Sequence, residues 1–126
     1  MKSTRTYWYP LSDESSTEWK EIEGSDGCLF ELTIAEDSES GDYTRLTKFK
    51  NGYSTEKFGP KSRYYPEEIF VVSGHLYDAA FDVWLTPGCY ASRLPGEVHG
   101  PFKANGDVVI LEISYPSQSV SKEKDN

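Results

Sequence analysis

Residues 61–74, KSRYYPEEIFVVSG, decide how this chain folds. Within the stretch, the apolar run 69–72 lies between Pro66 and Gly74, a pattern that predicts a buried β-strand. Cationic, aromatic and acidic residues come immediately before the run. The stretch therefore predicts a strand that starts in a polar site and continues into an apolar core.

Side chains alternate between two faces along a strand, so the spacing within this stretch predicts which residues meet. In a strand over residues 61–73, Lys61, Arg63 and Glu67 point to the face that also carries the core residues. Buried charges destabilise a fold unless they are paired. The three side chains are therefore expected either to form an ion-pair cluster or to bind a small anion, held by the planar guanidinium of Arg63 and the point charge of Lys61.

Residues 88–102, GCYASRLPGEVHGPF, carry a second set of polar candidates. A strand-like segment ends at the turn signal Pro95-Gly96, and His99 follows three residues after the glycine. Because histidine exchanges protons near pH 7, His99 and Glu67 are the candidate catalytic pair. Two more residues are expected to line the same pocket as ligand-binding groups: Tyr65 and Arg93.

The rest of the chain predicts an all-β protein. Alternation at Phe30, Leu32 and Ile34 indicates a half-buried strand. Asparagine–glycine and proline–glycine pairs give turn signals at 51–52, 87–88, 95–96 and 105–106. No segment keeps a helical apolar period, so we expect a sandwich or barrel with no helix longer than two or three turns.

The length of 126 residues favours one domain. Within it we expect an N-terminal arm at 1–18 and a barrel at 19–116. Residues 117–126 are polar and charged, and we expect them to form a disordered tail.

Composition and charge exclude several classes of partner. The formal net charge is -8 and no basic patch is present, which argues against nucleic acid. No apolar run approaches the ~20 residues of a membrane span, and the first ten residues lack the apolar core of a secretory signal, so we expect a cytoplasmic protein. Cys28 and Cys89 lack metal-ligand spacing and are expected to be reduced thiols, with a disulfide left open.

The two polar stretches resemble the two signature blocks of the cupin superfamily, most closely its ChrR-like group. In PEEIFVVSG, Glu67 and Gly74 fit the second half of the first block, and in RLPGEVHGPF, His99 fits the ligand position of the second block. The resemblance covers roughly residues 19–115. It implies a single-domain cupin jelly-roll barrel, and it favours a homodimer.

The first block departs from the family pattern where the family has two histidines. Those positions hold Lys61 and Arg63, which are cationic at neutral pH and do not ligate divalent metals in the ordinary way. The resemblance leaves Glu67 and His99, fewer than the three or four ligands that a zinc or non-haem iron site usually needs. We therefore expect no full metal site and no cofactor; zinc or iron, if bound, would be held by these two residues and water.

Together these residues indicate a small-molecule-binding barrel with an anion-friendly pocket. Glu67 and His99 would allow acid–base chemistry of isomerase or lyase type on a small organic acid without a redox metal. Two alternatives stay open: a metal-dependent enzyme of the cupin dioxygenase type, and a non-catalytic module that senses a metabolite. Phe70 and Val72 face away from Glu67 and need cover, either from the arm that carries Trp8 or from a second subunit, and the latter is a further reason to expect a homodimer.

Overall fold

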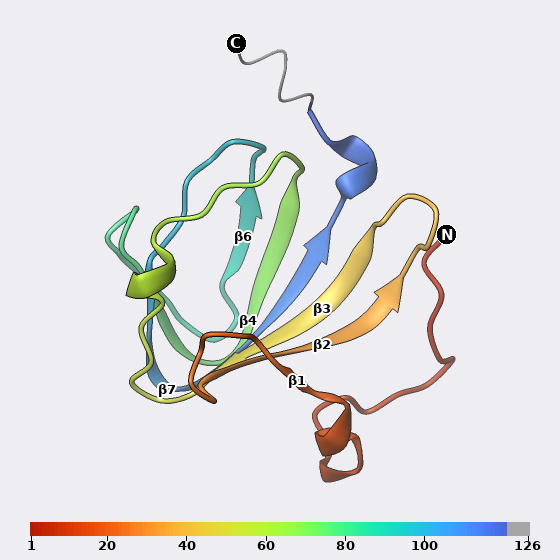
Figure 1. The fold of residues 1–126 in the computed structure, drawn as a ribbon, viewed down its shortest axis with the longest axis horizontal. Coiled ribbons are helices and arrows are strands. Elements are labelled where there is room, and N and C mark those ends of the chain that lie inside the picture. The colour runs from red at the N-terminus through yellow and green to blue at the C-terminus, as the bar shows by residue number, and fades with distance from the viewer. Residues whose placement is uncertain (121–126) are drawn as a thin grey trace.

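The computed structural model describes residues 1–120 and shows one antiparallel sheet curved into a jelly roll (Figure 1). The strands are β1 (Lys20–Glu21), β2 (Leu29–Glu36), β3 (Tyr43–Phe49), β4 (Glu67–Asp78), β5 (Val83–Leu85), β6 (Tyr90–Arg93) and β7 (Phe102–Ser114). Three short 3-10 helices complete the described chain: η1 (Asp13–Glu18), η2 (Glu56–Phe58) and η3 (Pro116–Gln118). The predicted all-β fold is confirmed, and no α-helix occurs in residues 1–120.

The sheet order is β1-β2-β3-β7-β4-β5, and β6 also pairs with β4. Figure 1 shows β6 and β4 on one flank and β3 and β2 on the other, with β7 between them. The two long strands, β4 and β7, thus form the centre of the sheet, and every other strand is built outward from them.

Apolar residues of the inner face form the core. Its buried members are Leu29, Phe49, Ile69, Val71, Leu76, Ala104, Val108 and Ile110. Burial of a side chain the size of valine or isoleucine stabilises a fold by roughly 1.5–3 kcal/mol. Ile69 and Val71 are both 1% exposed and share the inner face with Glu67, as strand alternation predicts.

Gly74 bends the central strand pair. Its φ is +77°, a conformation that L side chains rarely adopt, and a Cβ there would lie 2.3 Å from the Asp107 carbonyl oxygen. The register between β4 and β7 shifts on both sides of Ser73, and pairing resumes at His75 and Asn105. The turn signal at 105–106, which is typical of a β-hairpin, does not reverse the chain, because these residues lie inside β7 opposite the bend of β4.

The strand predicted to start at Lys61 starts at Glu67 instead, so the predicted strand over 61–73 is wrong. Proline has no N–H to donate to a sheet ladder, which explains why the strand begins directly after Pro66. The preceding loop is held by two backbone hydrogen bonds between Lys61 and His99, at 2.7 and 2.8 Å, and by a third from the Gly96 N–H to the Arg63 carbonyl, at 2.8 Å.

The alternation in β2 marks the outer face of that strand. Leu32 and Ile34 line a hollow beneath the N-terminal arm, whereas Leu29 and Glu31 line the barrel cavity. Glu31 also borders the hollow. Glu31 lies on the face of this strand that carries no apolar alternation, and it is this face that lines the barrel cavity.

The chain ends are attached to the barrel. Ser3 exchanges two backbone hydrogen bonds with Glu36, and the N-terminal amino group contacts Asp37 at 2.7 Å, which holds the pKa of that carboxyl well below its usual value. Of the tail predicted at 117–126, residues 121–126 lie outside the described residues, and the Ser117 N–H donates to Asp42 at 2.7 Å. None of the helices described is long and apolar enough to cross a membrane.

Candidate functional site

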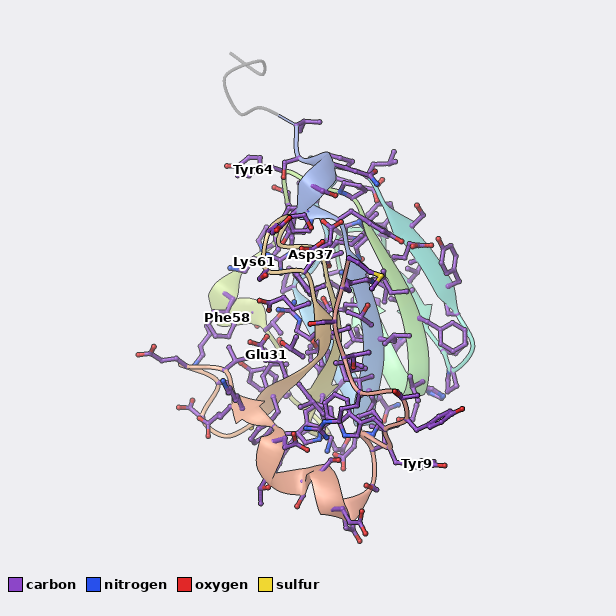
Figure 2. The ribbon with its side chains drawn as sticks, turned by 90° about the vertical axis from the view of Figure 1, so that its right-hand side faces the viewer. Tyr9, Glu31, Asp37, Phe58, Lys61 and Tyr64 are labelled. Atoms are coloured by element: carbon purple, nitrogen blue, oxygen red, sulfur yellow. The ribbon has the colours of Figure 1, made fainter. Side chains whose placement is uncertain are left out.

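The barrel encloses a cavity of about 370 Å³. Its apolar wall includes Ile22, Leu29, Phe49, Phe58, Leu76, Leu94, Phe102 and Ile110. The six residues predicted from the sequence all line it: Lys61, Arg63, Tyr65, Glu67, Arg93 and His99. Figure 2 shows three cavity residues, Glu31, Phe58 and Lys61, along one side of the molecule.

Glu67 begins β4 and is 4% exposed. The hydroxyl of Ser114 donates to one carboxylate oxygen at 2.8 Å, and Arg63 Nε lies 3.3 Å from the other. Burial by itself lowers the pKa of Arg63, but the charge of Glu67 together with those of neighbouring groups outweighs it, and the pKa is raised. The pair is thus an anionic and a cationic side chain, with the carboxylate buried and the guanidinium 43% exposed.

Arg93 lies directly across the strand pair from Glu67. Its guanidinium is 5.3 Å from the centre of the Phe102 ring, and its Nε is buried without a hydrogen-bond partner. Lys61 Nζ lies 5.7 Å from the Phe58 ring. Within residues 1–120, neither Arg93 nor Lys61 has a carboxylate within 4.0 Å, so both charges are available to a ligand.

Tyr65 supplies a neutral hydroxyl to this wall. Burial raises the pKa of Tyr65 above its usual value, and its hydroxyl lies 3.3 Å from that of Tyr43. The Arg63 guanidinium lies 5.8 Å from the Tyr65 ring. Tyr65 can therefore donate a hydrogen bond without adding charge.

His99 is held between two carboxylates. Its Nδ1 lies 2.9 Å from Asp78 and its Nε2 lies 2.7 Å from Glu97. The buried Asp78 also accepts the backbone N–H of Gly100 at 2.9 Å, which fixes that carboxylate. His99 donates a hydrogen bond to each carboxylate only when both of its ring nitrogens carry a proton.

The Phe81 ring stacks on the imidazole of His99, with the ring centres 4.9 Å apart. Sequence reasoning missed Asp78 and Glu97. Glu97 could have been found, because it lies two residues before His99 in the same turn. Asp78 gave no local signal, since it lies 21 positions away and meets His99 only through the pairing of β4 and β7.

A second polar cluster, also missed, lies on the opposite flank. We call it the Arg45 cluster: Glu31, Arg45, Thr47 and Glu112. Arg45 contacts Glu31 at 3.0 Å and Glu112 at 3.2 Å, and the Thr47 hydroxyl donates a short hydrogen bond to Glu112. Burial lowers the pKa of Arg45, but the charge of Glu112 and neighbouring groups outweighs it, so the pKa is raised. The signal was the alternation of β3, where Arg45 and Thr47 share the face of Phe49.

These residues do not fit the divalent metal that the cupin signature implies. Within residues 1–120 no group of three or more histidine, cysteine, aspartate or glutamate side chains is placed to hold a metal ion. Glu67 already accepts from Ser114 and pairs with Arg63. Both ring nitrogens of His99 are likewise taken.

Solved structures identify the fold. The chain is similar to an RmlC-like cupin from Shewanella frigidimarina NCIMB 400, with a TM-score of 0.68, 15% identity and coverage of 99% of this chain and 98% of that one. It is similar to KdgF from Halomonas sp., with a TM-score of 0.62, 14% identity and coverage of 84% and 89%. An acetylacetone dioxygenase from Acinetobacter johnsonii gives a TM-score of 0.68, 15% identity and coverage of 91% and 76%. No family model and no curated protein matches the sequence.

The fold is therefore that of the RmlC-like cupin structures, and the predicted single-domain jelly roll is confirmed. The anti-sigma factor ChrR, in its complex with SigE of Rhodobacter sphaeroides, is also similar, with a TM-score of 0.57 and 14% identity over 77% of this chain and 48% of that one. ChrR does not stand out among the similar structures, so a particular relation to the ChrR-like group stays a prediction.

Proposed function

We propose that this protein is a small-molecule-binding cupin whose barrel takes a small organic anion. The observation that carries the proposal is Arg93, a cavity cation with a buried, unpartnered Nε and no carboxylate beside it among the described residues. A charge-assisted hydrogen bond contributes about 1.5–3 kcal/mol when its geometry is good. A ligand carboxylate or phosphate would provide the acceptor that Arg93 lacks.

Arg63 and Lys61 would complete the anion site. Arg63 pairs with Glu67 through Nε alone, so its two terminal amino groups remain to bind a planar carboxylate in a bidentate manner. Lys61 would add charge without directional demand. The three cations come from the loop before β4 and from β6, which lie beside each other in the fold.

Glu67 and His99 would supply acid–base chemistry on the bound anion. A ligand carboxylate that binds Arg63 weakens the ion pair with Glu67 and frees one glutamate oxygen to accept a proton from the carbon next to the ligand's carboxylate. His99 would return a proton to another atom of the ligand from Nε2, which would have to give up its contact with Glu97. This exchange describes an isomerisation; loss of a neighbouring leaving group, protonated by His99, would make it a lyase reaction.

Similar structures include a dioxygenase and a polyketide cyclase, so the fold alone does not select a reaction. The dioxygenase-type alternative finds no support in the cavity, because the residues do not fit a metal. A non-catalytic metabolite sensor uses the same anion site, and only turnover separates it from an enzyme.

Thermal melting with a panel of small carboxylates and phosphates tests the anion site. We expect at least one anion to raise the melting temperature of the wild type, and Arg93→Met or Arg63→Met to weaken its binding by about ten-fold or more. Arg5→Met is the matched control, because Arg5 lies on the arm and pairs with Glu18 at 2.5 Å. If no anion stabilises the wild type, the proposal fails.

Glu67→Gln separates binding from chemistry. The variant removes a negative charge from the cavity, so anion binding is expected to persist or strengthen. Any turnover of a small acid should disappear, because the amide cannot accept the proton. An active wild type with an active Glu67→Gln variant would remove Glu67 from the catalytic role.

A further inference from the structure

The cavity charges are unevenly distributed, and the imbalance suggests more than an anion. In the Arg45 cluster two carboxylates, Glu31 and Glu112, share one guanidinium. This leaves one negative charge without a cation. Lys20 is the cross-strand neighbour of Glu31, but in the described part of the chain it forms no ion pair with Glu31 within 4.0 Å.

The opposite imbalance occurs at the proposed anion site. Of the three cations there, Lys61, Arg63 and Arg93, only Arg63 pairs with a carboxylate, Glu67, and the other carboxylate at this end, Glu97, contacts His99. In residues 1–120, Lys61 and Arg93 thus have no carboxylate within 4.0 Å. Since charges in a partly dehydrated cavity are stabilised chiefly by partners of opposite sign, each end selects a ligand group of its own.

The two ends lie on different elements of the cavity wall. The Arg45 cluster comes from β2, β3 and β7, whereas the cationic end comes from β6, the start of β4 and the loop before it. Figure 1 shows β2 and β3 on one flank of the sheet and β4 and β6 on the other. The curvature of the sheet brings both ends to one cavity of about 370 Å³, a volume within the ~300–1,000 Å³ of small-molecule sites.

We propose that the ligand is a small zwitterion that carries an ammonium group at one end and a carboxylate at the other. Its carboxylate binds Arg63 and Arg93, and its ammonium binds Glu31 in the Arg45 cluster. The inference rests on the proposed anion site and adds the second charge. Three strands, β3, β7 and β4, lie between β2, which carries Glu31, and β6, which carries Arg93. This order favours a linear ω-amino acid, in which several carbons divide the charged groups, over an α-amino acid.

Isothermal titration calorimetry with three matched series tests the inference: ω-amino acids of three to six carbons, the unsubstituted carboxylates and the primary amines of the same lengths. For at least one length we expect the amino acid to bind about ten-fold or more tightly than its carboxylate, with the amine alone weakest. If no amino acid binds more tightly than the carboxylate of the same length, the zwitterion proposal fails. The anion site still stands in that case, provided that the carboxylates bind. No binding by any compound of these series overturns the zwitterion, while the phosphates of the melting panel still test the anion site.

Glu31→Gln is the decisive variant. The Glu31 side chain is 37% exposed, so the fold is expected to tolerate the amide. The variant should lose the preference for the amino acid and bind the simple carboxylate as the wild type does. Glu36→Gln is the matched control, because Glu36 is an exposed carboxylate at the end of the same strand. A Glu31→Gln variant that keeps the full preference would overturn the assignment.

Discussion

Lys61 and Arg63 carry positive charge at the two positions where the cupin signature has histidines. A divalent cation near them would meet Coulomb repulsion. Glu67, the carboxylate that a metal would need, contacts Arg63 at 3.3 Å and Ser114 at 2.8 Å. At the scale of single residues the site therefore suits an anion better than a metal.

We predict that the purified protein retains no stoichiometric metal after dialysis against a chelator. To ligate a metal, His99 would have to give up a hydrogen bond to Asp78 or Glu97, and Glu67 would have to leave Arg63. Elemental analysis of the dialysed protein checks this. About one equivalent of zinc, iron, nickel or manganese per chain would contradict the prediction and imply ligands other than those of the cupin signature.

Some residues of the candidate site could be predicted from the sequence, and others could not. Glu67 and His99 were found because they belong to recognisable blocks, and both line the cavity; their roles stay predictions. Lys61 and Arg63 reach the same cavity from a loop, not from the strand that the alternation required. Glu112 was missed because its partner Arg45 lies 67 positions away, and no local pattern encodes that register.

At the scale of single elements, Gly74 determines the bend of β4. A side chain there would face two obstacles at once: the φ of +77° and the close approach of Asp107 and Val108. Gly52 shares only the first obstacle, since its φ is +80° and a Cβ would meet nothing within 4 Å. The two glycines therefore separate backbone strain from steric exclusion.

We predict that Gly74→Ala lowers the free energy of unfolding by more than about 3 kcal/mol, since β7 must move to admit the methyl group. Gly52→Ala should lower it by only about 1–2 kcal/mol, the strain of a left-handed alanine. Urea denaturation of both variants measures the difference. Equal losses would show that β7 yields easily and that only the φ requirement matters.

The outer face of β4 is connected to two neighbouring strands through Glu68. Tyr115, which follows β7, and Tyr90 of β6 both donate hydroxyl hydrogen bonds to this carboxylate, the latter at 2.7 Å. These hydrogen bonds lower the pKa of Glu68 below its ordinary value of 4.5, and the bond from Tyr115 has the larger effect. The same bond raises the pKa of Tyr115 to about 12. Glu68 thus connects three elements and adds to the stability of the sheet only while it is ionised.

The sign of the pH effect follows from these shifts. A carboxyl group whose pKa is lowered on folding stabilises the fold above pH 4.5, and this contribution is lost as the pH falls below it. We predict that Tyr115→Phe weakens this acid dependence between pH 5 and pH 3. The variant should also lose less stability between pH 10 and about 12, where Tyr115 stays protonated only in the folded wild type.

Urea midpoints measured across both pH ranges check this prediction. Tyr7→Phe is the control, because Tyr7 is 89% exposed and its hydroxyl has no such partner in the described chain. Parallel stability curves for the wild type and Tyr115→Phe would contradict a coupling between Glu68 and Tyr115.

At the scale of the whole molecule, the jelly roll could be predicted because strand alternation and turn signals recur along the chain. What the sequence could not supply was the face on which each strand packs. The arm over β2 buries Leu32 to 4% exposure on the outer side, so the strand has apolar residues on both faces. A period of two identifies such a strand, but which face is internal depends on what covers the other.

The same outer face lacks cover farther along the sheet. Phe70 is 43% exposed, Val72 is 38% exposed and Tyr90, the cross-strand partner of Phe70, is 58% exposed. Contiguous apolar residues on a sheet face mark an interaction surface. The arm covers β2 on the far flank of the sheet, and within residues 1–120 no segment other than β4 pairs with β6.

We predict that the protein is a homodimer that buries this face. Phe70→Lys places a charge at the centre of the exposed row and should shift sedimentation equilibrium from the dimer towards the 14.3 kDa chain. Tyr7→Ser, a substitution of an exposed aromatic residue on the arm, should leave the dimer intact. A wild type that sediments as a monomer at all concentrations would contradict the prediction, and the apolar row would then need a partner other than a second copy.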